Sequence, residues 1–212
     1  ESEAVLIGPG MVRGSRNYIG TGESGDETRE LVKGLLSKFP RKKWIIDAGA
    51  LQVMDAKWLK NLKEVIITPH FKELHQLFKS RTFGSDIRRA SNGTCFSIGK
   101  QVSKEFVSLI AQKAKEYNRV IALKGLTDII CSAQKCVYNT TGNEGMTKGG
   151  TGDILAGLIA GFACKNDLFL AASAGLYING LAGDELYQKV GSYFNASDLC
   201  DQIPKTLKEL IK

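Results

Sequence analysis

The stretch TGNEGMTKGGTGD, residues 141–153, is rich in glycine and runs directly into an apolar, helix-sized segment at residues 154–164. Glycine lets backbone N–H groups approach a ligand without interference from a Cβ atom. The first N–H groups of a helix have no partner within the helix and carry a partial positive charge. The stretch therefore predicts a helix that begins at a glycine turn and binds an anion at its start.

The predicted anion hole consists of Gly150, Thr151 and Gly152, and Thr151 adds a hydroxyl donor. Asp153 follows directly. A carboxylate at this point can accept a hydroxyl proton while the backbone amides hold a transferring phosphoryl group. The alternative is a helix-start carboxylate that only stabilises the free N–H groups. The turn lacks the Lys-Ser/Thr ending of a Walker A loop.

Outward from this turn, apolar strand-sized runs alternate with amphipathic helix-sized segments. This alternation predicts an α/β fold with a mostly parallel sheet and helices on both faces. No linker or repeat divides the chain. Residues 80–100 are polar and contain glycine, so we expect a less regular excursion there and not a domain boundary. The predicted strands are residues 4–7, 44–47, 65–68 and 120–123, with a hairpin of 128–131 and 136–138; the predicted helices are 27–39, 102–117, 154–164, 168–189 and 197–210, the last with a break or kink near Pro204.

Composition favours a soluble globular protein, with 43% hydrophobic and 24% charged residues among 212. The net charge of +7 is spread along the chain, which does not favour nucleic acid as a partner. No apolar run is long enough for a membrane span. The five cysteines form no C-x-x-C motif, so we expect reduced, buried thiols at Cys131, Cys164 and Cys200, as suits a cytoplasmic protein. The sequence is compatible with a homo-oligomer as well as with a monomer.

Polar or glycine-rich residues follow the ends of the predicted parallel strands, where sites form in α/β sheets. His70 is expected to contact a ligand, and Lys124 either binds a phosphate or extends along the strand end. Asp47 either orients a metal or ribose or caps a turn. Glu73 is expected in the first turn of a helix, and His75 on its surface or in the core. The strand ends are Gly8-Pro9-Gly10, Asp47-Ala48-Gly49, Thr68-Pro69-His70 and Lys124-Gly125.

Residues 143–157, NEGMTKGGTGDILAG, resemble the signature of the nucleotide-dependent NAD(P)H-hydrate dehydratases of the ribokinase-like superfamily. Four further motifs occur in the same order as in that family: IGPG (7–10), IDAGAL (46–51), ITPH (67–70) and LKG (123–125). The resemblance implies a three-layer αβα fold. It also implies a repair reaction in which ADP or ATP phosphorylates the hydroxyl of hydrated NAD(P)H, NAD(P)HX, and phosphate elimination restores NAD(P)H.

The resemblance also implies roles for individual residues. Asp153 would be the catalytic base, and Gly150, Thr151 and Gly152 would hold the phosphoryl group. Ser or Thr before the last Gly-Asp is typical of prokaryotic members, which favours ADP over ATP. Magnesium is the expected ion, with no protein residue assigned as its ligand. The nucleotide site would comprise Lys124, Gly125, Leu126, Thr127, Asp128 and Gly152, and the substrate site Gly10, His70, Asn143 and Asp153.

Three departures from the family pattern stand out. Met11-Val12 replaces the usual Leu-Gly after the first glycine turn, and Phe71-Lys72 follows the T-P-H motif. The family's N-terminal segment is missing before Gly8, so we expect residues 1–212 to be a single ribokinase-like domain that is truncated at its N-terminus. The alternatives are a kinase of the same superfamily that acts on a vitamin precursor or sugar, and a non-catalytic binding fragment.

Overall fold

The computed structural model describes residues 3–11, 25–78 and 102–211, so the predicted excursion at residues 80–100 lies outside the described residues. The elements follow one another as the sequence predicts, with strands and helices alternating up to the hairpin. In chain order they are β1 (Ala4–Ile7), α1 (Gly25–Lys38), β2 (Lys43–Ile46), α2 (Ala48–Val53), η1 (Ala56–Asn61), β3 (Glu64–Ile67), α3 (Phe71–Phe78), α5 (Lys104–Tyr117), β4 (Val120–Leu123), β5 (Asp128–Cys131), β6 (Cys136–Asn139), η3 (Glu144–Met146), α6 (Thr151–Lys165), α7 (Leu168–Val190) and α8 (Ala196–Leu210).

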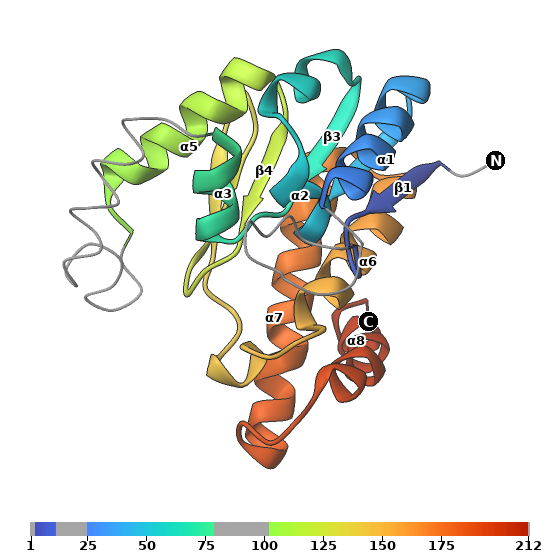
Figure 1. Ribbon diagram of the computed structural model, residues 1–212. Coiled ribbons are helices and arrows are strands. Elements are labelled where there is room, and N and C mark those ends of the chain that lie inside the picture. The colour runs from blue at the N-terminus through green and yellow to red at the C-terminus, as the bar shows by residue number, and fades with distance from the viewer. Residues whose placement is uncertain (1–2, 12–24, 79–101, 212) are drawn as a thin grey trace.

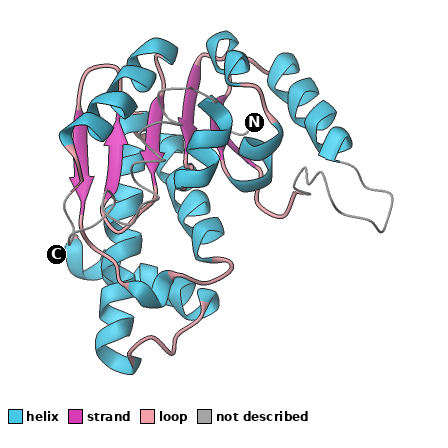
Figure 2. Ribbon diagram, turned by 60° about the vertical axis from the view of Figure 1, so that its left-hand side comes forward, coloured by secondary structure: helices cyan, strands magenta, loops and turns pink. Residues whose placement is uncertain are grey.

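The sheet contains the six strands in sequence order, β1 to β6 (Figures 1 and 2). Strands β1 to β4 are parallel, and β5 and β6 add an antiparallel hairpin beside β4. The prediction of a mostly parallel sheet with a terminal hairpin is therefore confirmed. Because β1 to β4 are parallel neighbours, their carboxyl ends meet at one rim of the sheet.

The sheet is covered on both faces, which confirms the three-layer αβα architecture. On one face, side chains such as Ile46 and Ile67 pack against α1, α2, α3 and α5. On the other face, Ile45 and Ile66 pack against α6 and α7 (Figure 1). Helix α8 packs on α7 beyond the sheet. Successive strand residues point to opposite faces, so burial on both faces explains the continuous apolar runs.

Helix α7 is closely packed, as its Ala- and Gly-rich sequence predicts. A Cβ atom on Gly175 would lie 2.4 Å from the Cγ1 of Ile159 in α6, which shows how closely the two helices approach. Despite its apolar character, neither α7 nor any other helix of the described residues has the length and hydropathy needed to cross a membrane.

The structure corrects two local predictions about helices. Helix α8 runs without a break through Pro204, because a capping box of Asn195 and Asp198 starts it and buried residues hold it before the proline, at Leu199 and Ile203, and after it, at Thr206. The short helices α2 and η1 were not predicted. Each has only six residues, too few for a helical period to stand out in the sequence.

The cysteine prediction is wrong for Cys131 and only partly right for the others. Cys131 and Cys136 occupy paired positions of the β5–β6 hairpin and form a disulfide. Cys164 is half-buried and Cys200 is exposed, both as free thiols. A disulfide across the hairpin removes the support that the cysteines gave to a reducing compartment.

Candidate active site

The rim of the sheet brings the four predicted strand ends together. His70, after β3, forms a parallel bridge with Lys124, after β4, and the Lys124 N–H donates to the carbonyl of Pro69 at 2.9 Å. On the other side, the Asp47 N–H donates to the carbonyl of Ile7 at the end of β1. The rim that the sequence predicts from four separate motifs is therefore one continuous surface.

The first glycine turn is shaped by its contact with the end of β2. Gly8 has a φ of 121°, and a Cβ atom there would lie 1.8 Å from the carbonyl oxygen of Asp47. Gly10 has a φ of 73° and is exposed at the rim, with open space where a side chain would begin. Gly8 is thus required for packing, whereas Gly10 leaves room for a ligand.

Asp47 and Lys124 form an ion pair across the rim. The Lys124 Nζ donates to Asp47 Oδ1 at 2.7 Å, and Asp47 is only 1% exposed. Asp47 precedes α2 without capping it through its side chain, and the next residue, Ala48, has a φ of 44°. Of the two roles open to Asp47, turn cap and metal or ribose ligand, the structure shows no side-chain cap; its carboxylate instead fixes Lys124.

Lys124 reaches the start of α6. A Cβ atom on Gly152 would lie 3.7 Å from Lys124 Nζ, so the ammonium group lies beside the first turn of that helix. The lysine charge and the helix N-terminus together make this point of the rim attractive to an anion.

The glycine turn leads directly into α6, as the sequence predicts. Gly150 is the residue before the helix and has a φ of 91°, and a Cβ atom there would lie 2.9 Å from the Cβ of Ala196. The prediction about the Thr151 hydroxyl is wrong. Thr151 is buried, and its Oγ1 lies 2.7 Å from the carbonyl oxygen of Met146 and 2.9 Å from that of Lys148, so the hydroxyl bonds within the turn.

Asp153 lies in the first turn of α6 with its side chain exposed. No other residue of the described ranges donates a hydrogen bond to its carboxylate or forms an ion pair with it. The carboxylate is therefore accessible to a ligand held at the helix start.

His70 is held in place by the helix that follows it. Its Nδ1 accepts from the N–H groups of Lys72 at 3.1 Å and Glu73 at 3.3 Å. Glu73 is buried in the first turn of α3, as predicted, and accepts the His70 N–H at 2.9 Å. Nε2 lies 3.5 Å from Glu73 Oε1, and the imidazole is about half exposed at the rim. His75 is half-buried on the same helix.

The loop between β4 and β5 is braced by Asp128. Its Oδ1 accepts the Gly125 N–H at 2.9 Å, and its Oδ2 accepts the Asn139 Nδ2 at 2.9 Å. Burial raises the pKa of Asp128 to about 6, although these hydrogen bonds and Lys124 oppose the shift. Leu126 is 69% exposed at the loop tip, whereas Thr127 is buried. Asn139 was missed in the sequence, where it is only a polar residue ending a strand.

Asn143, predicted to contact substrate, has a side chain engaged within its own loop. Its Oδ1 accepts the Gly145 N–H at 3.0 Å, and its Nδ2 donates to Asp184 Oδ1 at 2.9 Å. Asp184, on α7, was also missed. An acidic residue in a buried, Ala- and Gly-rich helix needs a polar partner, and that signal was available in the sequence.

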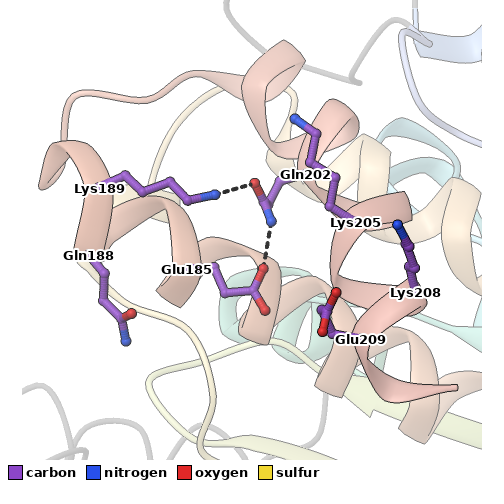
Figure 3. A pocket seen from close by; sticks show the side chains of 7 residues that line it. All are labelled: Glu185, Gln188, Lys189, Gln202, Lys205, Lys208 and Glu209. Atoms are coloured by element: carbon purple, nitrogen blue, oxygen red, sulfur yellow. Dashed lines mark hydrogen bonds between the residues drawn. The ribbon is translucent and has the colours of Figure 1, made fainter. Parts of the chain in front are cut away.

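The described residues contain no group of three or more His, Cys, Asp or Glu side chains that could hold a metal ion. A cavity of about 670 Å³ lies between α7 and α8 (Figure 3), and none of the residues that line it belongs to the rim. The buried Gln202 in this cavity accepts from Lys189 Nζ at 2.9 Å and donates to Glu185 Oε2 at 2.6 Å, so these three side chains hydrogen-bond to one another. At the rim, the exposed carboxylate of Asp153 lies in the first turn of α6, directly after the glycine turn.

Comparison with known proteins shows the family to which the chain is related. A family model described as NAD(P)H-hydrate dehydratase matches residues 1–205. The chain is 33% identical over 185 residues to the bifunctional NAD(P)H-hydrate repair enzyme Nnr of Methanocaldococcus jannaschii, covering 87% of this chain and 31% of that protein. It is 34% identical over 183 residues to the ADP-dependent (S)-NAD(P)H-hydrate dehydratase of Nitrosopumilus maritimus, covering 86% and 57%.

Solved structures show the same relationship. The ADP/ATP-dependent NAD(P)H-hydrate dehydratase of Bacillus subtilis, co-crystallised with ATP/Mg²⁺, superposes with a TM-score of 0.71 at 26% identity, covering 99% of this chain and 67% of that one. A hydroxyethylthiazole kinase of Pyrococcus horikoshii, 19% identical with a TM-score of 0.57, shares the fold. The chain spans about a third of the length of the bifunctional relatives. On these matches, the chain belongs to the NAD(P)H-hydrate dehydratase family.

Proposed function

We propose that this chain carries out the nucleotide-dependent dehydration of (6S)-NAD(P)HX to NAD(P)H, with ADP as the preferred phosphoryl donor. The observation that carries the proposal is the meeting of three features at the start of α6. These are the accessible carboxylate of Asp153, the Gly150 and Gly152 amides, which bond no acceptor among the described residues, and the Lys124 ammonium fixed by Asp47.

The chemistry follows from these positions. Asp153 accepts the proton of the substrate hydroxyl as its oxygen attacks the terminal phosphorus of ADP, and AMP leaves. The amides of Gly150, Thr151 and Gly152 hold the transferring phosphoryl group, where positioning and charge stabilisation matter most. Elimination of phosphate from the phosphorylated intermediate then restores NAD(P)H.

The other rim residues divide between the two ligands. The nucleotide lies along the Lys124–Asp128 loop, with Gly125 offering its backbone, Leu126 its exposed side chain and Thr127 completing the loop. Gly10 and His70 face the hydrated dinucleotide. The substrate is a small molecule, and we place its repair in the cytoplasm, where the nicotinamide cofactor pool is used.

Magnesium fits this donor set as an ion that arrives with the nucleotide. Mg²⁺ keeps several waters and binds through substrate phosphates plus one or two carboxylates, so a preformed cage of side chains is not needed. Asp153 is the accessible carboxylate beside the turn that could serve it. When bound, the ion neutralises charge on the phosphate oxygens.

The experiment that tests the proposal compares ADP with ATP as donor for (6S)-NADHX, with Mg²⁺ present, and identifies the products. Formation of NADH, phosphate and AMP, with a higher kcat/KM for ADP, is expected. A stable phosphorylated alcohol would assign the chain to the kinases of the superfamily instead. No reaction with either donor, in the chain within its full native protein, would favour a non-catalytic binding role.

A further inference from the structure

One carboxylate of α7, that of Asp184, binds two consecutive residues of the loop that leads into the glycine turn before α6. Asp184 Oδ2 accepts the Gly142 N–H at 2.9 Å, and Asp184 Oδ1 accepts the Asn143 Nδ2 at 2.9 Å. Both oxygens of one side chain thus bind consecutive residues of the loop. Hydrogen bonds to an ionised acceptor are roughly twice as strong as neutral ones, so this contact resists displacement of the loop.

The hydrogen bonds continue from Asn143 to the start of α6. Asn143 Oδ1 caps η3 by accepting the Gly145 N–H, and η3 ends at Met146. The carbonyl of Met146 accepts from Thr151 Oγ1 at 2.7 Å. A continuous path therefore joins Asp184 on α7 to the residue at the centre of the glycine turn.

Close packing leaves this path little freedom to adjust. A Cβ atom on Gly183, the residue before Asp184, would lie 2.4 Å from Met146 Sδ. A Cβ atom on Gly145 would lie 2.7 Å from the ring of Phe194, which is buried. The loop therefore fits against α7 in one arrangement, and Asp184 sets its register along the helix.

We propose that Asp184 and Asn143 are positioning residues that hold the amides of Gly150, Thr151 and Gly152 in place for phosphoryl transfer. The inference rests on the proposed function of the anion turn, that is, the glycine turn at Gly149–Gly152 before α6. It gives Asn143 an indirect role, through η3 and Thr151, in place of the substrate contact that the sequence suggested. Misplacement of a transition-state contact lowers kcat, whereas most of the contacts expected for the nucleotide lie on the separate Lys124–Asp128 loop.

The pair allows an exchange experiment that conserves charge and every hydrogen bond. In Asn143→Asp, two carboxylates face each other without a donor between them. In Asp184→Asn, residue 184 has one side-chain oxygen in place of two, so it cannot accept from both the Gly142 N–H and the Asn143 Nδ2. In the double variant N143D/D184N, the residue-184 amide can accept the Gly142 N–H and donate to the residue-143 carboxylate, which still caps Gly145. Tyr187→Phe is the matched control, because Tyr187 donates to Glu144 of the same loop from the same helix, but at the surface.

The variants are compared by kcat and KM for ADP and by amide hydrogen exchange across residues 142–153. Each single variant is expected to lower kcat about 100-fold at a nearly unchanged KM, and to speed exchange in the loop. The double variant is expected to recover both to within about fivefold of wild type, and Tyr187→Phe to change neither by more than about twofold.

Two results would overturn the inference: single variants that fold and keep wild-type kcat and exchange, or a folded double variant with no recovery. If the wild-type protein shows no turnover at all, the proposed function fails, and the exchange measurements alone decide the positioning role. Fast exchange in the single variants, reversed in the double variant, then supports it, and unchanged exchange refutes it.

Discussion

Two aspartates lie at the rim, one at the end of β2 and one at the start of α6, and their positions give the same side chain different surroundings. Asp47 is 1% exposed and paired with Lys124 at 2.7 Å. Asp153 is exposed, and none of the described residues pairs with it. A buried carboxylate needs a cation to offset its lost hydration, whereas an exposed one is available for chemistry. In the function proposed above, the end of β2 therefore supports the site, and the start of α6 performs the reaction.

The sharpest way to break this comparison is Asp153→Asn. Loss of the base is expected to lower kcat by about 100- to 10,000-fold. Stability and ADP affinity are expected to change little, because the side chain is exposed. Steady-state kinetics and a binding titration check this, and near-normal kcat in the variant would rule out Asp153 as the base.

Asp47→Asn is expected to act on stability first. The variant leaves Lys124 without its charged partner, which costs about 3 kcal/mol when the pair is buried. Urea unfolding measures this difference, with Asp153→Asn as the control expected to stay within about 1 kcal/mol of wild type. Equal stability of the two variants would show that the buried pair does not support the fold.

A third carboxylate, that of Asp128, is expected to make the stability of the fold depend on pH. Its pKa is raised by burial to about 6, above the value in the unfolded chain, so the folded state binds the proton more tightly. Its contribution to stability is therefore full below about pH 4 and is lost as the pH rises through about 6, for a total of roughly 2 to 3 kcal/mol.

The measurement is urea unfolding of wild type and Asp128→Asn between about pH 4 and pH 7.5. Wild type should lose stability relative to the variant over that range. A constant difference between the two proteins would mean that Asp128 does not titrate there.

The smallest expected effect is a difference in stability between alanine variants of two neighbouring glycines, Gly149 and Gly150, in the turn before α6. Gly150→Ala places a Cβ atom in a left-handed conformation and 2.9 Å from Ala196, at an expected cost of about 2 kcal/mol. Gly149→Ala meets open space and should cost no more than about 0.5 kcal/mol. Thermal unfolding of the pair tests this, and equal melting temperatures would mean that the turn adjusts freely.

Much of the fold could be predicted because the relevant signals are local. The apolar runs in the predicted strands 44–47 and 120–123 indicated strands covered on both faces, and these segments form the parallel strands β2 (Lys43–Ile46) and β4 (Val120–Leu123). The glycines before α6 likewise predicted a turn that runs into a helix, and α6 begins directly after Gly150. The short helices α2 and η1 gave no periodic signal.

The parts of the site that could not be predicted depend on partners far apart in the chain. Asp47 could not be assigned from its own neighbours, because Lys124 lies 77 residues away. The hydroxyl of Thr151 looked free for a ligand until Met146 and Lys148 were seen to accept from it. Asp184, 41 residues from Asn143, became part of the site only when α7 was seen to pack against the loop.

The most direct test of the account is the product stoichiometry of wild type and Asp153→Asn with (6S)-NADHX, ADP and Mg²⁺. For wild type we expect NADH and phosphate to form one to one, with consumption of an equal amount of ADP; for the variant we expect almost no product while ADP still binds. Equal NADH formation by both proteins, or a phosphorylated alcohol that accumulates without NADH, would contradict it.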